Sequence, residues 1–450
     1  MNHRNEKRIS FVFYYLSSIV IIGGFLLFIP FFVGLISGER AIVGKLFLGF
    51  ILPGFASIVV GSIIRIFSKS GTLLLKDAMV VCTVSWILLT LIGAVPFSVV
   101  LDVGYLNSCF ETMSGFTTTG ITLLSHLDEL PRSILFWRAF TQWIGGLGIL
   151  SMFILIGFRG GSAANKLFLA EGHKVATPRP SPSMFNTARV FWTLYICFTI
   201  AEASILILLG LDLFDSITHA MTTISTGGYS IHDSSIEYYR IRGFANADLI
   251  EITIMVFMMI GAVSFFVHYR IRKGKIRALW DNTEIRYFWF IIIAGVLLIF
   301  LHHTGIYGIS FREYNGSDYS GLKGIMFNIK EVAFQVVSIL TTTGYTTRDI
   351  SSSYFTPFAK QIFLILMMVG GCAGSTSGGV KVIRIAILTK LIKNRIIKLN
   401  SSRLVRIPLT VDNEIVEDGE IKRIFSLLFM WIILLICTFA LLGVNMYHLI

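Results

Sequence analysis

Charged residues are scarce in this chain. Asp, Glu, Lys and Arg make up 14% of its 450 residues, whereas 54% are hydrophobic. Soluble globular proteins carry roughly 25% charged residues, and an apolar run of about 20 residues is long enough to cross a bilayer as a helix. Because many such runs occur here, the sequence predicts an all-α polytopic membrane protein and favours one membrane domain over several soluble ones.

Cysteine-based and metal-based motifs are also missing. The five cysteines are scattered along the chain, and no CxxC pair or Cys/His cluster occurs. Neither a disulfide framework nor a zinc site is therefore predicted. The chain has no HExxH motif and no paired intramembrane aspartates, so an enzyme is not expected. The same absences lead us to expect no cofactor.

The net charge is +12, which in a soluble protein would suggest nucleic acid as a partner. In a membrane protein, however, Lys and Arg gather in cytoplasmic loops. With the N-terminus inside, the cytoplasmic loops would be the basic segments 65–76, 158–189, 270–286 and 381–423. The charge-balanced loops would then lie outside, at 101–132, 229–247, 304–331 and 345–357. We therefore expect a multi-pass plasma-membrane protein in the lipid bilayer, with a cytoplasmic N-terminus and no nucleic acid.

Apolar runs divide the chain into five parts. Two N-terminal transmembrane helices are predicted in 1–76. Three repeats of span, polar segment and span follow at 77–158, 184–277 and 280–400, and 412–450 begins a fourth with one helix. The expected spans are 11–36, 43–67, 77–100, 133–157, 190–211, 248–269, 286–303, a broken segment from 358 onward, and 424–445.

A polar, glycine-ended stretch occurs once in each repeat. We call these stretches the first, second and third filter copies: Ser114–Gly120, Thr222–Gly228 and Ser338–Gly344. Amphipathic segments of about 12 residues precede them at 105–116, 213–224 and 327–340, too short to span and suited to half-helices. Re-entrant backbone is tolerated only where it is buried or lines a water-filled path. Three copies on one side therefore predict convergence on one pore, whereas a single copy would be an ordinary exterior turn.

The composition of the filter copies suits a dehydrated monovalent cation. Glycine allows positive φ, so that carbonyl oxygens can replace the hydration shell of an alkali ion. Threonine adds a compact hydroxyl acceptor and a β-branched body that packs behind the backbone. A half-helix that ends at the copy also directs its negative end toward the pore. Calcium and magnesium would instead favour carboxylates or retained water.

These motifs resemble the Trk/Ktr/HKT superfamily of potassium-uptake proteins, over nearly the whole chain. The matching stretches are the filter copies with their extensions to Asp233 and Tyr345, Gln142–Gly148, and Gly370–Arg384. The resemblance implies four repeats of helix, pore loop and helix around a central ion path. The two extra N-terminal spans favour the Trk type. The stretch around Gly374 would be the intramembrane loop that breaks the second helix of repeat three, with a simple helix kink as the alternative.

The resemblance also implies roles for residues. K⁺ would bind at a selectivity filter of Thr117, Thr118, Thr119, Gly120, Ser225, Thr226, Gly227, Gly228, Thr341, Thr342, Thr343 and Gly344. A gate beneath it would comprise Gly374, Ser375, Thr376, Ser377, Gly378, Gly379 and Lys381. Glycine at position 120, where sodium-permeable members carry serine, favours K⁺. The expected partners are a second copy of the chain in a homodimer and a cytoplasmic nucleotide-binding regulatory subunit, in the bacterial inner membrane.

The fourth repeat departs from this pattern, because the sequence ends after its first helix. A ring of three filter copies would leave backbone polar groups facing a gap. The sequence alone therefore leaves two expectations open: the channel-like subunit of a potassium-uptake system, or a non-conducting or regulatory membrane subunit.

Overall fold

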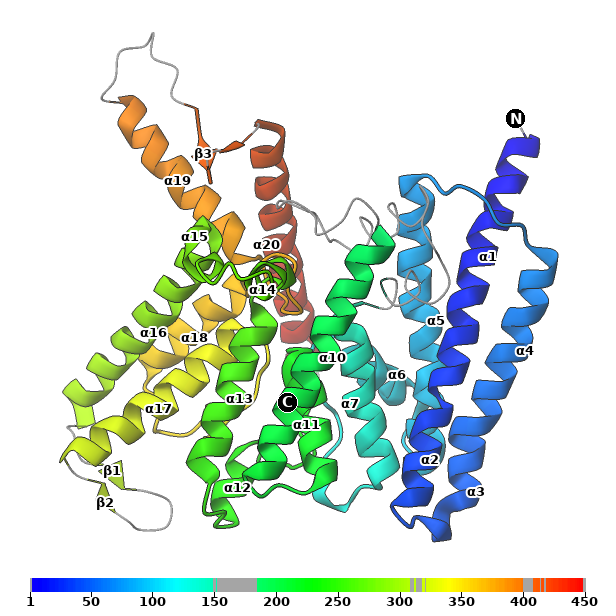
Figure 1. The fold of residues 1–450 in the computed structure, drawn as a ribbon, viewed down its shortest axis with the longest axis horizontal. Coiled ribbons are helices and arrows are strands. Elements are labelled where there is room, and N and C mark those ends of the chain that lie inside the picture. The colour runs from blue at the N-terminus through cyan, green and yellow to red at the C-terminus, as the bar shows by residue number, and fades with distance from the viewer. Residues whose placement is uncertain are drawn as a thin grey trace.

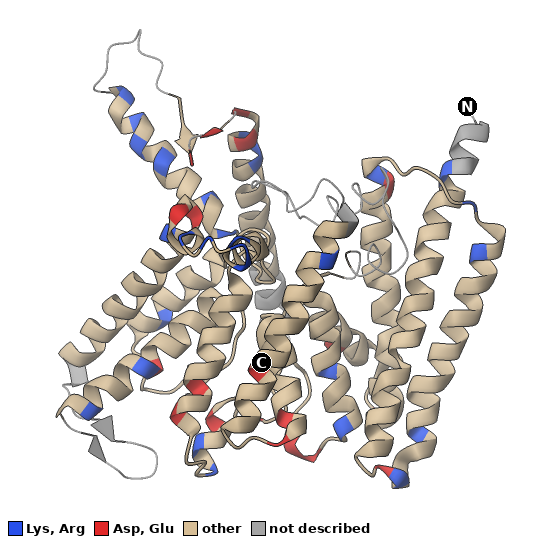
Figure 2. Ribbon diagram, in the orientation of Figure 1, with Lys and Arg blue, Asp and Glu red and all other residues tan. Residues whose placement is uncertain are grey.

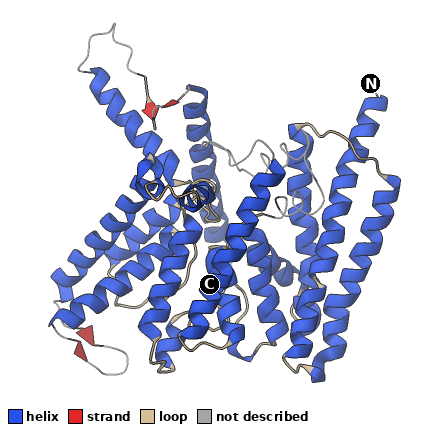
Figure 3. Cartoon of the chain, viewed as in Figure 1, coloured by secondary structure: helices blue, strands red, loops and turns tan. Residues whose placement is uncertain are grey.

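The computed structural model describes residues 2–148, 151, 184–307, 311–312, 318–319, 321–399, 408–412, 414–416 and 418–447. The regular elements of the described residues are helices, apart from two ribbons of two-residue strands, β1 (Phe311–Arg312) with β2 (Asp318–Tyr319) and β3 (Thr410–Val411) with β4 (Glu414–Ile415) (Figure 3). Six of its helical segments are long and apolar enough to cross a membrane. The predicted all-α membrane class is confirmed.

Two long helical segments form one flank of the molecule (Figure 1). The first consists of α1 (Asn2–Leu26) and α2 (Phe28–Ile36). The second consists of η1 (Arg40–Ile42), α3 (Val43–Leu46), η2 (Phe47–Ile51) and α4 (Leu52–Phe67). Small residues allow α1 and α4 to approach closely, since a Cβ on Gly24 would lie 2.6 Å from the carbonyl oxygen of Gly54. Such contacts replace the hydrophobic driving force that is absent between helices in lipid.

Repeat one begins with α5 (Leu75–Leu101) and the half-helix α6 (Tyr105–Phe116). The short helix η3 (Leu127–Glu129) and α7 (Arg132–Gly146) follow. The predicted bounds of the half-helix are confirmed at both ends. Within the span expected at 133–157, α7 ends at Gly146, and Gly148 has a φ of +81°. The remainder of the expected span, apart from Ser151, and most of the basic loop 158–189 lie outside the described residues.

Repeat two contains α10 (Met184–Leu208), the half-helix α11 (Leu213–Ile224) and the short α12 (Glu237–Ile241). The continuous span expected at 248–269 is wrong. The structure has α13 (Ala247–Ala262) and α14 (Phe265–Arg272), bent by 99° at Val263–Ser264. The bend frees the last carbonyls of α13, and these bind the loop that breaks repeat three.

Repeat three follows the short α15 (Ala278–Asp281) and contains α16 (Thr283–Tyr307), α17 (Gly321–Leu340), α18 (Pro357–Val369) and α19 (Val382–Leu399). The predicted break in the segment from 358 onward is confirmed: it lies between Val369 and Val382, and we call residues 370–381 the inner loop. The expected half-helix at 327–340 is too short, because α17 has 20 residues. Its first turn contains exposed Leu322 and also Gly324. Neither residue is typical of the start of an amphipathic helix. After β3 and β4, α20 (Asp418–Tyr447) contains the predicted last span.

Side chains pack into two large apolar cores around the half-helices. The first joins the N-terminal helices to repeat one and α10, and contains the fully buried Trp137. The second joins α13 to repeat three and contains Phe288. The middle parts of the long helices carry few charges, whereas Lys and Arg are frequent along α19 and around α14 (Figure 2). Hydrophobic faces toward lipid and charged ends toward water are the distribution expected of membrane-spanning helices.

Candidate ion filter and the inner loop beneath it

The three half-helices end at equivalent residues. The last residues of α6, α11 and α17 are Phe116, Ile224 and Leu340, each four positions before the filter glycine. The C-terminal end of a helix carries a partial negative charge. Each half-helix therefore ends at the third residue of a filter copy, as predicted from the sequence, and its negative end favours a cation there.

The backbone has the same unusual conformation in all three copies. Two positions have positive φ: Thr118 (+53°) and Gly120 (+77°), Thr226 (+52°) and Gly228 (+74°), and Thr342 (+58°) and Gly344 (+90°). A left-handed conformation costs a threonine about 1–2 kcal/mol. Such strain persists where surrounding contacts impose it, typically at functional sites. The threefold recurrence indicates one conserved backbone shape and not three independent turns.

Local hydrogen bonds hold this shape. The residue six positions before each glycine accepts from a filter amide: Thr119 to Ser114 (2.9 Å), Gly227 to Thr222 (2.9 Å) and Thr343 to Ser338 (3.0 Å). In the first and third copies the same serine also donates its hydroxyl to the carbonyl that follows the filter glycine, at 2.6 Å each. The first residue of each copy, which is still part of the half-helix, thus fixes the backbone of the rest of the copy by hydrogen bonds.

Successive copies are in direct contact. A Cβ on Gly120 would lie 2.2 Å from the carbonyl oxygen of Gly227, and a Cβ on Gly228 would lie 1.7 Å from that of Thr343. Real Cβ atoms do not approach oxygen so closely, so only glycine fits at either position. The predicted convergence of the three copies is therefore present in the structure. Binding of K⁺ to them remains a prediction.

The inner loop packs against the second and third copies. The hydroxyl of Thr376 donates to the carbonyl of Ile224 (2.9 Å) and to that of Gly261 (3.0 Å). The backbone amide of Gly378 donates to the hydroxyl of Thr342 (2.7 Å). The structure thus places the predicted gate segment against the filter residues. Lys381 turns back, with a φ of +80°, and donates to the carbonyl of Ser377 within the loop.

Backbone groups at the bend in repeat two and at the break in repeat three form hydrogen bonds with each other. The amide of Cys372 donates to the carbonyl of Ala262 (2.9 Å), and the amide of Phe265 donates to that of Gly374 (2.9 Å). Glu284, at the start of α16, accepts from the amide of Ala373 (2.6 Å). Irregular backbone at membrane depth requires such partners. Neither the bend nor Glu284 was predicted from the sequence, in which the small residues Gly261, Ala262 and Ser264 are the local signal.

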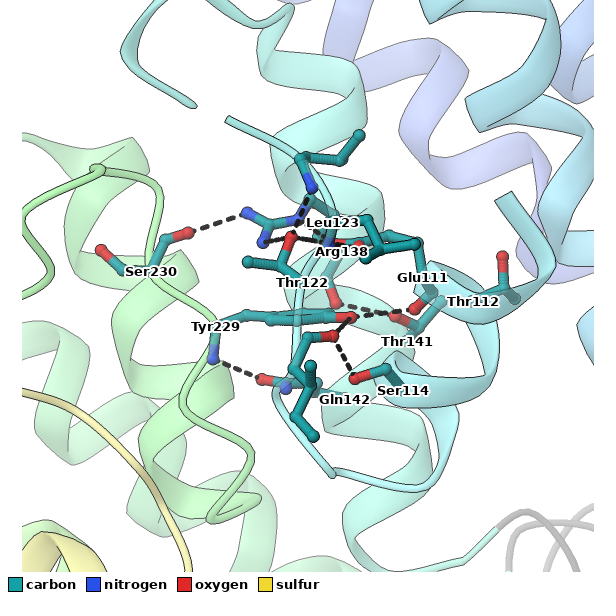
Figure 4. A network of polar contacts seen from close by, with 12 residues as sticks. Glu111, Thr112, Ser114, Thr122, Leu123, Arg138, Thr141, Gln142, Tyr229 and Ser230 are labelled. Carbon is teal, nitrogen blue, oxygen red and sulfur yellow. Dashed lines mark hydrogen bonds and ion pairs between the residues drawn. The ribbon is translucent and has the colours of Figure 1, made fainter. Parts of the chain in front are cut away.

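A buried ion pair within repeat one also contacts repeat two (Figure 4). Glu111 on α6 and Arg138 on α7 are each 1% exposed, and Arg138 donates to Glu111 at 2.9 Å. The same guanidinium donates to the carbonyl of Ser230 (2.9 Å) and lies 4.3 Å from the ring centroid of Tyr229. Glu111 also accepts from Thr122 (2.9 Å). The network connects the first half-helix to the segment that leaves the second filter copy.

A second network joins repeats two and three. The carboxylates of Glu251 and Glu331, both 1% exposed, lie among basic side chains. The cations are Arg240, Lys330 and Arg348. Glu331 accepts from the hydroxyl of Thr347 (2.8 Å), just past the third copy. Neither network was predicted, because its members lie far apart in the sequence.

Two acidic residues, Asp233 and Asp349, follow the second and third filter copies. Asp233 accepts from the amide of Leu127 (3.0 Å) and so contributes to packing of the loops. Asp349 accepts from the hydroxyl and the amide of Ser351, and these hydrogen bonds lower the pKa of its carboxyl group. Asp349 therefore keeps its negative charge in mildly acidic solution, close to the third copy.

Half-helices that point at three contacting filter copies, with a broken transmembrane helix against them, define a pore-loop type of ion-transport protein. Comparison with known proteins gives the particular family. Residues 50–448 match the family model of TrkH, a cation transport protein, and the chain belongs to this family.

Relatives are similar over much of the chain. An uncharacterised cation transporter of Methanocaldococcus jannaschii is 30% identical over 447 residues, covering 98% of this chain and 85% of that protein. The Trk system potassium uptake protein TrkH of Escherichia coli is 32% identical over 330 residues, covering 72% of this chain and 63% of the relative. The match to this TrkH thus spans slightly less than two thirds of its length.

A solved structure has the same fold. The crystal structure of the potassium transporter TrkH from Vibrio parahaemolyticus superposes with a TM-score of 0.72 at 28% identity. The superposition covers 91% of this chain and 82% of that structure.

Proposed function

We propose that this chain is the channel-like transmembrane subunit of a Trk-type system and takes up K⁺ across the plasma membrane. The observation that carries the proposal is the threefold recurrence of one backbone shape in filter copies that touch one another. Backbone carbonyls and threonine hydroxyls replace the hydration shell of a K⁺ ion. Glycine at positions 120, 228 and 344 supports K⁺ over Na⁺. The names of the E. coli and Vibrio relatives agree with this substrate.

Potassium uptake is tested in cells that lack their own uptake systems. The full-length protein is expressed with a tag that quantifies its abundance in the membrane. We expect growth at micromolar to millimolar K⁺ and uptake of ⁸⁶Rb⁺ that external Na⁺ inhibits only weakly. Equal inhibition by Na⁺ and K⁺, or no uptake by protein that is present in the membrane, would contradict the proposal.

The inner loop serves as the gate in this proposal. It contacts the second and third filter copies through Thr376 and Gly378, and it forms backbone hydrogen bonds with the bend in repeat two. Opening of the path requires that these hydrogen bonds break. Each typically stabilises the seated position by about 1 kcal/mol.

Substitution Thr376→Val tests this role of the inner loop. Valine has the same shape but cannot donate to the carbonyls of Ile224 and Gly261, so the seated loop loses stability. We expect ⁸⁶Rb⁺ uptake per molecule to rise about three- to tenfold, corresponding to roughly 1 kcal/mol. Ser375→Ala is the matched control, because the Ser375 hydroxyl bonds only within the loop. Unchanged or slower uptake by Thr376→Val at normal abundance would contradict a gating role.

The assembly and its sidedness are also part of the proposal. A cytoplasmic N-terminus places α14 and α19 at the cytoplasmic face, together with their basic residues Arg270, Arg272, Lys390, Lys393 and Arg395. This face suits a nucleotide-binding regulatory subunit with an acidic docking surface. A homodimer in the inner membrane completes the proposed assembly.

A further inference from the structure

Gln142 is a completely buried amide that reaches from repeat one into the second filter copy (Figure 4). Its Nε2 donates to the carbonyl of Gly227 at 2.8 Å, and its Oε1 accepts from the amide of Tyr229 at 3.0 Å. Only one orientation of the amide group satisfies both bonds, because the nitrogen donates and the oxygen accepts. Gln142 lies one helical turn after Arg138 on α7, and both side chains hold the same segment of repeat two.

The second filter copy differs from the others at the position next to its glycine. The first and third copies carry threonine there, and its hydroxyl bonds the threonine two residues earlier: Thr117 with Thr119 and Thr341 with Thr343, at 2.8 Å each. The second copy has Gly227 and so cannot form this pair. The amide of Gln142 occupies the space instead, since a Cβ on Gly227 would lie 2.4 Å from its Cδ.

We infer that Gln142 is a positioning residue that replaces the missing threonine pair and sets the ion discrimination of the second filter copy. The inference rests on the proposed potassium uptake. Gln142 fixes both Gly227 and Tyr229, on either side of the filter glycine Gly228. It also lies at the junction with the first copy, 3.7 Å from the position of a Cβ on Gly120. When Gln142 holds the filter backbone at this junction, the ion-binding cavity keeps the size of K⁺. When these hydrogen bonds are lost, the backbone can move and adapt to the smaller Na⁺.

The first test is Gln142→Met in the full-length protein. Methionine is unbranched and of similar length, but it can bind neither Gly227 nor Tyr229. We expect the ratio of K⁺ to Na⁺ uptake to fall about tenfold, the equivalent of one to two net hydrogen bonds. Gln142→Asn keeps the amide on a shorter side chain and is expected to lose discrimination as well. The matched control is Trp143→Phe, which removes one hydrogen bond to Thr199 on α10 and none to a filter copy.

A compensating pair separates positioning from simple packing. Gly227→Thr alone collides with Gln142, whereas Gln142→Ala together with Gly227→Thr makes room and restores a hydroxyl pair with Ser225. We expect the double variant to discriminate K⁺ from Na⁺ better than either single variant.

An unchanged uptake ratio in Gln142→Met, or a double variant no better than its parents, would overturn the inference. The ion dependence of the Tm of purified protein provides a second readout that needs no uptake, with the preference for K⁺ over Na⁺ reduced in Gln142→Met. A wild-type protein that fails to discriminate would instead overturn the proposed function.

Discussion

Gly228→Ala is expected to abolish potassium uptake. The added Cβ would lie 1.7 Å from the carbonyl oxygen of Thr343, and the residue has a φ of +74°. The left-handed backbone alone costs about 1–2 kcal/mol, and relief of the overlap requires the second and third filter copies to separate. We expect ⁸⁶Rb⁺ uptake to fall by at least about 100-fold, equivalent to some 3 kcal/mol. Gly120→Ala, whose Cβ would lie 2.2 Å from the carbonyl oxygen of Gly227, is expected to be nearly as severe.

Gly243→Ala provides the control for Gly228→Ala. Gly243 has almost the same φ, +73°, but a Cβ there would meet nothing within 4 Å. The Gly243→Ala variant therefore has the free-energy cost of a left-handed backbone without a collision. Its uptake per molecule should remain close to that of the wild type. If Gly228→Ala retained uptake while Gly243→Ala reduced it, close contact between the filter copies would not be required for transport.

Arg138→Met is expected to cause the largest loss of stability. Removal of the guanidinium leaves the carboxylate of Glu111 buried without its counter-ion, and the carbonyl of Ser230 loses a donor. Breaking a buried ion pair in this way typically costs about 3–5 kcal/mol. We expect a large decrease in the Tm of the purified protein and less protein in the membrane.

Two further variants separate charge burial from loss of packing. Glu111→Gln combined with Arg138→Met removes both charges and should recover part of the Tm. Arg132→Met, on the same helix, breaks an exposed pair with Asp212 at 3.5 Å, where both side chains are about half exposed. Exposed pairs contribute at most about 1 kcal/mol, so its Tm should change little. A similar Tm decrease for Arg132→Met and Arg138→Met would show that burial of the pair is not the cause.

Local patterns were sufficient to predict much of the fold. Apolar runs predicted the spans, and polar glycine-ended stretches predicted where α6, α11 and α17 end. Both signals lie within a few residues of the structure they specify, because helix length and turn conformation follow from nearby side chains. The bend at Val263–Ser264 could not be predicted in this way. It is stable because carbonyls of α13 find donors in the inner loop, more than 100 residues later in the chain.

The candidate site was likewise predictable in part. The convergence of the three filter copies was predicted because their pattern recurs, and the inner loop because glycines and serines interrupt an apolar run. The residues that hold these segments were missed. Gln142 and Arg138 look like ordinary polar residues of a helix, and only their bonds to Gly227 and Ser230 reveal their roles.

The sequence by itself determined that this protein lies in a membrane, repeats a helix and a polar stretch three times, and presents helix ends and glycines suited to a cation. Those properties follow from hydrophobic runs and from the backbone freedom of glycine, which are local. The tertiary structure alone decided which carbonyl lies against which glycine, and that a glutamine from repeat one forms a hydrogen bond with the filter copy of repeat two. These contacts join residues 85 or more positions apart, and burial makes their bonds specific because no water can replace a missing partner.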